Sequence, residues 1–380
     1  MTTAMCYRPN PAGGVSLNVL ADGHAQPNPL GGGGITGPHN ISAVKMLRIS
    51  VTDVCNLRCL YCMPEEGVEW LPKSEILSFE EIAAIVRASV GLGITHFKLT
   101  GGEPTARKDL PVLVEMLRKI PGVEDLSLTT NGILLTPLLP RLREAGLNRI
   151  TLSLDSLRPD RFKQITRGGD FTRVWTALES ALSMDFTRIK INVVVMRDMN
   201  VDEIPDFAAL TLSYPLTVRF IEFMPLGRSG LTDDPLSAMV SEAQIRRAIE
   251  STHGPIQSVD RQSERGVGPA KVFALPGAPG RLGFISAMSH PFCETCNRLR
   301  LTPDGMMRSC LFDGGEVDLK PILRGGELDP TTKTRKHEID ADGNLVGPES
   351  RIAAAMTTCV TLKPDTHSQH GNKAMNRIGG

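Results

Sequence analysis

The chain has 380 residues, of which 41% are hydrophobic and 22% charged, and its 42 Lys and Arg balance its 42 Asp and Glu. That length allows one large core or several smaller ones, and the balanced charge argues against a nucleic-acid partner or an acidic membrane surface. No apolar run reaches the roughly 18 residues of a membrane span, and no secretory signal is present, so we expect a soluble, cytoplasmic protein.

Residues 1–44 are rich in Gly, Pro, Asn and Ala, include GGGG at 31–34, and show no periodicity. This composition predicts a disordered leader. The stretch has one acidic residue, as a transit peptide would, and a mitochondrial matrix location is then the alternative; its single arginine, Arg8, argues against that.

From residue 45 onwards, short apolar runs alternate with amphipathic stretches. Strands are predicted at 45–52, 95–100, 125–131, 149–155, 188–196 and 216–224. Helices are predicted at 78–93, at 109–120, up to Gly146, in two segments before 188, and near 203–212. The first helix has a capping box formed by Ser78 and Glu81.

Alternating strands and helices predict an α/β fold with a parallel sheet, either doubly wound or a partial barrel. In both folds ligands gather where the strands end. The residues there are small or polar: Thr52, Asp53, TGGEP at 100–104, TTNG at 129–132, Ser153 to Asp155, and EFMPLG at 222–227. We place the sheet domain at 45–225, a C-terminal lobe at 226–325 and an uncertain tail at 326–380.

A first cysteine triplet, Cys55, Cys59 and Cys62, follows the first predicted strand at this rim. Three thiolates can bind zinc with a fourth ligand, join a disulfide set, or hold three irons of a four-iron cluster. The odd count, the CxxxCxxC spacing and the absence of a nearby histidine favour an iron-sulfur cluster with one open iron.

A second triplet, Cys293, Cys296 and Cys310, encloses the sequence NRLRL. Arg298 and Arg300 alternate there on one predicted strand face, beside what would be a second open cluster. Zinc remains the alternative on local spacing.

CxxxCxxC with an aromatic residue before its last cysteine, together with the later GGEP, resembles the radical S-adenosylmethionine superfamily. The resemblance implies a partial (β/α)6 TIM-like barrel. It also implies that the open iron binds S-adenosylmethionine and cleaves it to a 5'-deoxyadenosyl radical. The glycines of GGEP would let the backbone approach the ammonium group of that ligand.

The second triplet, LRISVTD before the first triplet, IEFMP at 221–225 and the terminal IGG resemble the GTP 3',8-cyclase family of molybdenum cofactor biosynthesis, the MoaA type. The resemblance implies a lyase with two 4Fe-4S clusters and S-adenosylmethionine that joins ribose C3' to guanine C8, giving (8S)-3',8-cyclo-7,8-dihydroguanosine 5'-triphosphate. It assigns GTP contacts to Arg48, Lys98, Thr129, Lys190, Arg219, Arg298 and Arg300. It assigns S-adenosylmethionine contacts to Tyr61, Gly102, Ser153 and Met224.

The sequence departs from the family pattern beside the GGEP motif and in residues 327–374, and it matches the pattern at its end. Lys98 stands where the family usually has arginine, and His96 where it has a second basic residue, which would weaken triphosphate binding. Gly379 and Gly380 match a terminal Gly-Gly that reaches the active site and supports catalysis together with Arg298 and Arg300. Residues 327–374 match nothing familiar.

Two alternatives remain open: a twin-cluster radical enzyme acting on a peptide or other substrate, and a zinc-stabilised nucleotide-binding protein. The expected partners are GTP, a reductant and a downstream cyclic pyranopterin synthase, and a homodimer is a further candidate assembly.

Overall fold

The computed structural model describes residues 37–184, 186–226, 231, 234, 236–260, 267–325, 338–339, 345–368, 370–371 and 375–378. The expected leader lies outside the described residues as far as residue 36. Its last part, residues 37–44, forms a turn and the 3-10 helix η1 (Ile41–Ala43), and Val44 is buried.

Six parallel strands lie side by side in chain order. They are β1 (Met46–Ser50), β2 (His96–Thr100), β3 (Asp125–Thr130), β4 (Arg149–Ser153), β5 (Arg188–Val195) and β6 (Thr217–Glu222). A doubly wound sheet reverses its strand order at a switch point, and this sheet does not. The predicted partial barrel is therefore confirmed, and its strands occur where the apolar runs predict them.

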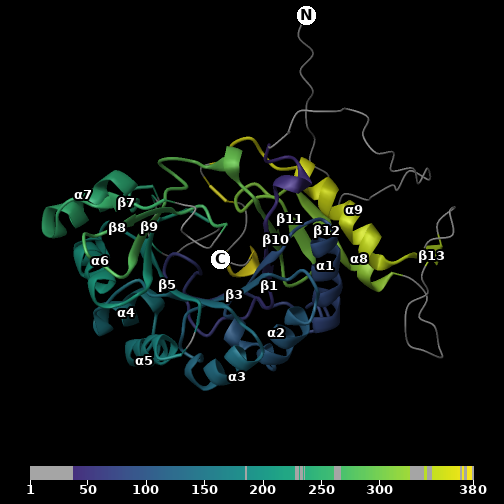
Figure 1. Cartoon of the computed structure of the whole chain (residues 1–380), viewed down its shortest axis with the longest axis horizontal. Coiled ribbons are helices and arrows are strands. Elements are labelled where there is room, and N and C mark those ends of the chain that lie inside the picture. Colours follow the sequence, from purple (N-terminus) through teal and green to yellow (C-terminus); the bar gives the residue numbers. More distant parts are fainter. Residues whose placement is uncertain are drawn as a thin grey trace, which may run out of the picture.

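Helices cover the outside of the barrel (Figure 1). They are α1 (Phe79–Gly91), α2 (Leu110–Arg118), α3 (Leu139–Glu144), α4 (Pro159–Thr166), α5 (Phe171–Leu182) and α6 (Ile204–Ser213), with 3-10 turns η2 (Pro104–Ala106), η3 (Thr136–Leu138) and η4 (Val201–Glu203). The capping box at the start of α1 is present: Ser78 and Glu81 exchange side-chain and backbone hydrogen bonds.

The residues after β6 extend this sheet at both edges. β9 (Arg281–Ile285) pairs in parallel with β6, and β10 (Arg298–Leu301) pairs in parallel with β1. The remaining elements of this region are α7 (Glu242–His253), β7 (Gln257–Ser258), β8 (Lys271–Ala274), η6 (Cys293–Thr295), β11 (Met306–Arg308), β12 (Glu316–Asp318) and α8 (Lys320–Arg324). The second triplet is thereby carried to the edge of the barrel next to β1, the strand that precedes the first triplet.

The C-terminal elements are β13 (Glu338–Ile339), β14 (Leu345–Val346), α9 (Pro348–Thr361) and α10 (Met375–Ile378). β13 and β14 form a separate two-stranded sheet. α9 lies against α1, where Arg87 pairs with Glu349 at 3.1 Å and Ser89 lies 3.5 Å from the sulfur of Met356. Among the described helices, none combines the length and hydrophobicity that crossing a bilayer requires.

Candidate active site

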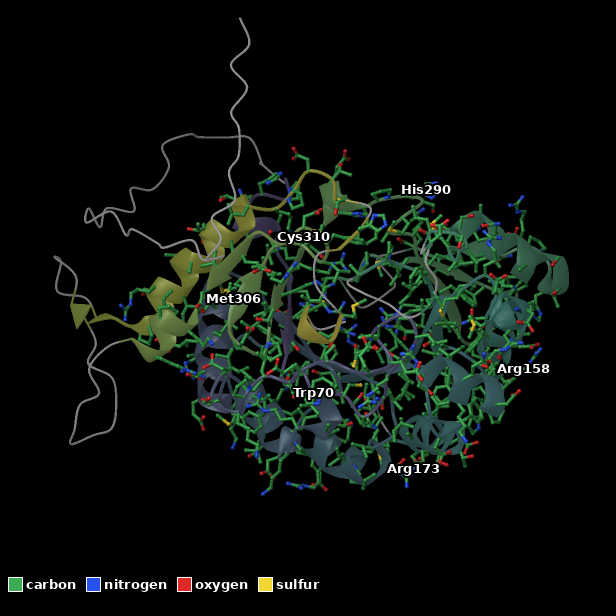
Figure 2. The ribbon with its side chains drawn as sticks, turned by 180° about the vertical axis from the view of Figure 1, so that it is seen from behind. Trp70, Arg158, Arg173, His290, Met306 and Cys310 are labelled. Atoms are coloured by element: carbon green, nitrogen blue, oxygen red, sulfur yellow. The ribbon has the colours of Figure 1, made fainter. Side chains whose placement is uncertain are left out.

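Both cysteine triplets line one cavity of about 290 Å³, at the carboxyl ends of the barrel strands. The predicted site residues that line it are Arg48, Cys55, Cys59, Tyr61, Cys62, Lys98, Gly102, Thr129, Ser153, Arg219, Met224, Cys293, Cys296, Arg298, Arg300 and Cys310. In the side-chain view, Cys310 lies far from Arg158 and Arg173 on the outer helices (Figure 2). Residues more than two hundred positions apart in the sequence thus share one chamber.

The first triplet sits on a loop that β1 delivers to the rim. A tight turn places the backbone N–H of Cys62 2.9 Å from the carbonyl of Cys59, and Asn131 lies 3.9 Å from the sulfur of Cys55. Burial raises the pKa of the Cys55 thiol to about 11, and burial, then Cys62 and Asp155, holds that of Cys59 well above its usual value. Thiols in such surroundings are stable as thiolates when a cationic metal group holds them.

This donor set fits an iron-sulfur cluster. In the described part of the chain, no three His, Cys, Asp or Glu side chains are grouped to hold a single metal ion. A four-iron cluster does not require such grouping, because each thiolate bonds a different iron. Three soft thiolates, with no fourth cysteine beside them among the described residues, would leave one iron available to another molecule.

The GGEP segment packs directly on the first-triplet loop. The backbone N–H of Gly102 donates to the Thr52 carbonyl at 2.7 Å, and that of Glu103 to the Val54 carbonyl at 2.8 Å. A Cβ at Gly102 would come within 2.4 Å of the carbonyl oxygens of Asp53 and Val54. Close contact between the two loops therefore requires glycine here, in addition to any need of a ligand.

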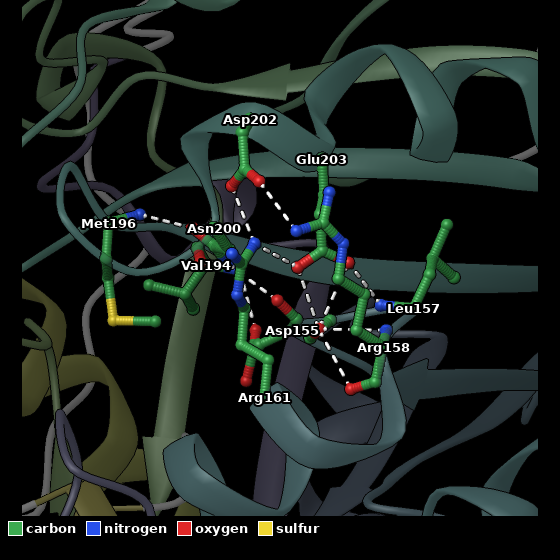
Figure 3. Close-up of polar contacts among 10 residues, drawn as sticks. Asp155, Leu157, Arg158, Arg161, Val194, Met196, Asn200, Asp202 and Glu203 are labelled. Atoms are coloured by element: carbon green, nitrogen blue, oxygen red, sulfur yellow. Dashed lines mark hydrogen bonds and ion pairs between the residues drawn. The ribbon is translucent and has the colours of Figure 1, made fainter.

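Tyr61 connects the same loop to the barrel. Its hydroxyl donates to the Asp155 carboxylate at 2.8 Å, and the other oxygen of that carboxylate accepts from the Val194 backbone at 2.8 Å. Burial raises the pKa of Asp155 to about 6, against the effect of these two bonds. The side-chain amide of Asn200 donates hydrogen bonds to the backbone carbonyls of Asp155 and Val194 (Figure 3). These bonds fix the two residues relative to each other.

A row of cations crosses the barrel interior. Arg300, Arg48 and Lys98 occupy matching positions on the adjacent strands β10, β1 and β2. Burial and neighbouring cations lower the pKa of Arg48 to about 9 and hold those of Lys98 and Arg300 well below their usual ranges. A group of like charges of this kind is costly to bury, and its position in the cavity is suited to binding a polyanion.

Hydroxyl groups and a further arginine surround Lys98. Its ammonium donates to Thr129 at 3.1 Å and to Thr151 at 3.2 Å, and Arg219 donates to Thr151 at 3.1 Å. Burial and then Arg149 lower the pKa of Arg219 to about 10.

Lys190 is a predicted site residue that does not line the cavity, although Asn192, two positions later on β5, does. Burial and then Arg219, Arg149 and Arg188 lower the pKa of Lys190 to about 6. Gly379 and Gly380 lie outside the described residues.

The second triplet has a basic environment. Arg298 lies 3.9 Å from the sulfur of Cys296 and 5.0 Å from the centre of the Phe292 ring. Burial would raise the pKa of the Cys296 thiol, but Arg298 and then Lys363 lower it below its usual value. The two triplets thus share the cavity but differ in charge surroundings, since Glu103 and Asp155 lie near the first.

Comparison with known proteins agrees with this geometry. A model of the radical SAM superfamily matches residues 49–211, and a model described as Molybdenum Cofactor Synthesis C matches residues 216–368. A GTP 3',8-cyclase of Pelotomaculum thermopropionicum is 45% identical over 341 residues, covering 89% of this chain and 98% of that protein. The chain belongs to the GTP 3',8-cyclase family.

A second member of this family, from Moorella thermoacetica, is 43% identical, with the same coverage of 89% and 98%. The crystal structure of Streptococcus suis SuiB bound to S-adenosylmethionine has a TM-score of 0.50 at 16% identity, covering 70% of this chain and 60% of that one. This second likeness shows the fold alone. Family membership makes the chain an enzyme of the radical SAM, GTP 3',8-cyclase type.

Several residues of this cyclase cavity were not predicted as site residues. Asn192 lines it with a buried amide oxygen that has no hydrogen-bond partner among the described residues. Lys363 and His367 also line it. Asp155 lies in a rim segment that the sequence indicates, but its bond to Tyr61 needs the fold, and nothing in the sequence around Lys363 and His367 points to the cavity.

Proposed function

We propose that this chain converts GTP to (8S)-3',8-cyclo-7,8-dihydroguanosine 5'-triphosphate, the first step of molybdenum cofactor biosynthesis. The observation that carries the proposal is that both cysteine triplets line one cavity together with Arg300, Arg48 and Lys98 of the adjacent strands β10, β1 and β2. A cavity with a radical source at one end and a substrate holder at the other is what this cyclisation requires.

The cofactors are two 4Fe-4S clusters and S-adenosylmethionine. Cys55, Cys59 and Cys62 would hold the first cluster, and Cys293, Cys296 and Cys310 the second. Tyr61, Gly102, Ser153 and Met224 would bind S-adenosylmethionine beside the first, and their common position on the cavity wall supports this. When bound, these cofactors supply the radical that removes the C3' hydrogen of the ribose.

The cavity residues bind and orient the substrate. A triphosphate carries about four negative charges, which would satisfy the cationic row of Arg300, Arg48 and Lys98 and the adjacent Arg219. Thr129 would add a hydroxyl contact. Lys190, which lies outside the cavity lining, would attract the phosphates through its charge. Arg298 would lie beside the purine at the second cluster. Holding the ribose and the guanine in one orientation keeps C3' close to C8, which favours this intramolecular ring closure.

The terminal glycines Gly379 and Gly380 would enter the cavity and assist Arg298 and Arg300 in catalysis. Two observations support this: Met375 of α10 lines the cavity, and Ile378, one residue before the glycines, is buried. Glycine has no side chain, so two in succession can follow a narrow path between bound groups.

The remaining partners follow from the reaction. A reductant must supply one electron that cleaves S-adenosylmethionine and a second electron that, with a proton, converts the cyclised radical to product. A cyclic pyranopterin synthase would consume that product. We place the enzyme in the cytoplasm, as its bacterial relatives suggest, and a second copy of the chain is a candidate partner in a homodimer. A mitochondrial location has no support.

A double variant tests substrate assignment. Arg298→Ala with Arg300→Ala is expected to abolish GTP cyclisation and weaken GTP binding while iron content stays unchanged. Arg158→Ala with Arg173→Ala, on the outer helices, is the matched control. Unchanged GTP binding in the first variant would contradict the nucleotide assignment and favour a radical enzyme with another substrate.

Metal analysis distinguishes the cyclase from the zinc-binding alternative. A zinc-stabilised nucleotide-binding protein would be colourless, would carry one or two zinc ions, and would not cleave S-adenosylmethionine. The cyclase is expected to be coloured and to contain iron and sulfide.

A further inference from the structure

The segment from Leu362 to Ser368 follows α9 and packs beside the second cysteine triplet. The sequence alone shows no family likeness for this part of the chain, but the Molybdenum Cofactor Synthesis C model extends over it to residue 368. Its backbone begins against the turn that follows Cys310: a Cβ at Gly315 would lie 2.6 Å from the carbonyl oxygen of Leu362. That turn is closed by the backbone N–H of Cys310, which donates to Gly314 at 3.0 Å. The segment therefore packs against the loop carrying the third cysteine.

Lys363 connects the segment to the second cysteine of the triplet. Its ammonium donates to the backbone carbonyl of Cys296 at 2.9 Å, and the residue is only 5% exposed. Burial lowers the pKa of Lys363, and the Cys296 thiol acts against this effect. A buried ammonium aimed at the backbone of a thiolate residue fixes that residue and offsets its charge.

His367 connects the segment to the first cysteine and to the third loop. The backbone of His367 makes a hydrogen bond to the Cys293 thiol. The imidazole stacks on Phe312, with ring centroids 4.1 Å apart, and its Nε2 lies 2.8 Å from the Ala287 carbonyl oxygen. The next residue, Ser368, donates its backbone N–H to Asp313 at 2.6 Å.

One short segment thus contacts the neighbourhood of all three cysteines, which come from two separate loops. Without it, the loop at Cys293 and Cys296 and the loop at Cys310 would have to keep their spacing unaided. Thiolate ligands need their positions fixed by surrounding contacts if a cluster is to be retained.

We propose that Lys363 and His367 are positioning residues that clasp the second cysteine triplet, so that retention of the second cluster depends on the segment Leu362–Ser368. The inference rests on the proposed function, because it assumes that this triplet holds a cluster. It assigns to this C-terminal segment a role in holding the active site together.

The test uses the full chain, prepared anaerobically with iron and sulfide. Lys363→Met removes the ammonium at similar length, Lys363→Arg keeps a cationic donor, and His367→Ala removes the stacked ring. Matched controls are Lys320→Met, which removes a lysine bonded to Glu75, and His253→Ala, which removes an imidazole 2.9 Å from the Pro205 carbonyl. Iron per chain, the electron paramagnetic resonance spectrum of the reduced protein, and reductive cleavage of S-adenosylmethionine without GTP are measured.

For Lys363→Met and His367→Ala we expect about half the iron of the parent chain. The spectrum should lose the second cluster, S-adenosylmethionine cleavage should persist, and Lys363→Arg should restore the iron. Full iron with an unchanged spectrum would overturn the proposal. Loss of both clusters together would also overturn it, because the residues would then support the whole fold. A parent chain with only one cluster would instead contradict the proposed function itself.

Discussion

The hydroxyl of Tyr61 donates a 2.8 Å hydrogen bond to the carboxylate of Asp155, joining the loop of the first cysteine triplet to the end of β4. Tyr61 lies between two of the cysteines, and Asp155 is almost fully buried. This hydrogen bond therefore helps to fix the position of the cysteine loop relative to β4.

Tyr61→Phe removes that hydroxyl and leaves one carboxylate oxygen of Asp155 without its donor. We expect the free energy of unfolding to fall by about 1–3 kcal/mol and the affinity for S-adenosylmethionine to weaken, with iron content unchanged. Denaturant unfolding and equilibrium dialysis measure the two effects. Tyr214→Phe, outside the cavity, serves as the control, and equal affinities in both variants would contradict a role for this contact in the cofactor site.

Lys190→Met should have opposite effects on stability and on substrate binding. Burial and neighbouring cations hold the pKa of Lys190 at about 6, so the folded state bears a cost that an apolar side chain removes. We expect the ligand-free protein to gain about 1–4 kcal/mol of stability and to bind GTP more weakly. Thermal unfolding with and without GTP checks both, and a destabilised variant with normal GTP affinity would be inconsistent with a buried, substrate-directed lysine.

GTP binding should weaken as the pH rises. Lys190 has a pKa of about 6 in the ligand-free fold against an ordinary value of 10.5, and a bound polyanion raises it again. Binding therefore takes up protons between these two values, and affinity falls through that window by at most about tenfold per pH unit for each proton. Calorimetry in two buffers of different ionisation enthalpy, above the titration range of the terminal phosphate, reports the uptake directly.

The same linkage predicts the pH dependence of stability without ligand. Between about 6 and 10.5 the unfolded chain binds more protons at Lys190 than the folded chain, so Lys190 makes stability rise with pH across this window. Lys190→Met should reduce both slopes. Slopes identical to those of the parent chain would show that Lys190 is not the group responsible.

Gly102→Ala should disturb the first cluster. Its Cβ would lie 2.4 Å from two backbone carbonyl oxygens of the cysteine loop, a distance that forces the loop to move. We expect loss of iron from the first cluster and of S-adenosylmethionine cleavage. Gly91→Ala, where nothing lies within 4 Å of the added atom, should leave both unchanged and slightly stabilise α1.

The sequence predicts the barrel well because the patterns involved are local. Apolar runs locate β1 to β6, and Ser78 with Glu81 marks the start of α1. The cysteine spacings likewise indicate which residues hold metal before any contact is known.

Long-range pairing is what local patterns do not contain. Nothing in RLRL shows that β10 pairs with β1 and sets Arg300 beside Arg48, and nothing around Lys363 shows that it reaches Cys296. Lys190 and Asn192 share one face of β5, yet only the fold shows that Asn192 lines the cavity and Lys190 does not.

The most direct test of the central claim combines metal analysis with isotope transfer. Anaerobically prepared protein is analysed for iron and sulfide, then supplied with reductant, S-adenosylmethionine and GTP deuterated at C3', and the products are weighed by mass spectrometry. We predict about eight irons per chain, a cyclised isomer of GTP and deuterium in 5'-deoxyadenosine. Fewer than about four irons, or a cyclised product with no deuterium transferred, would contradict it.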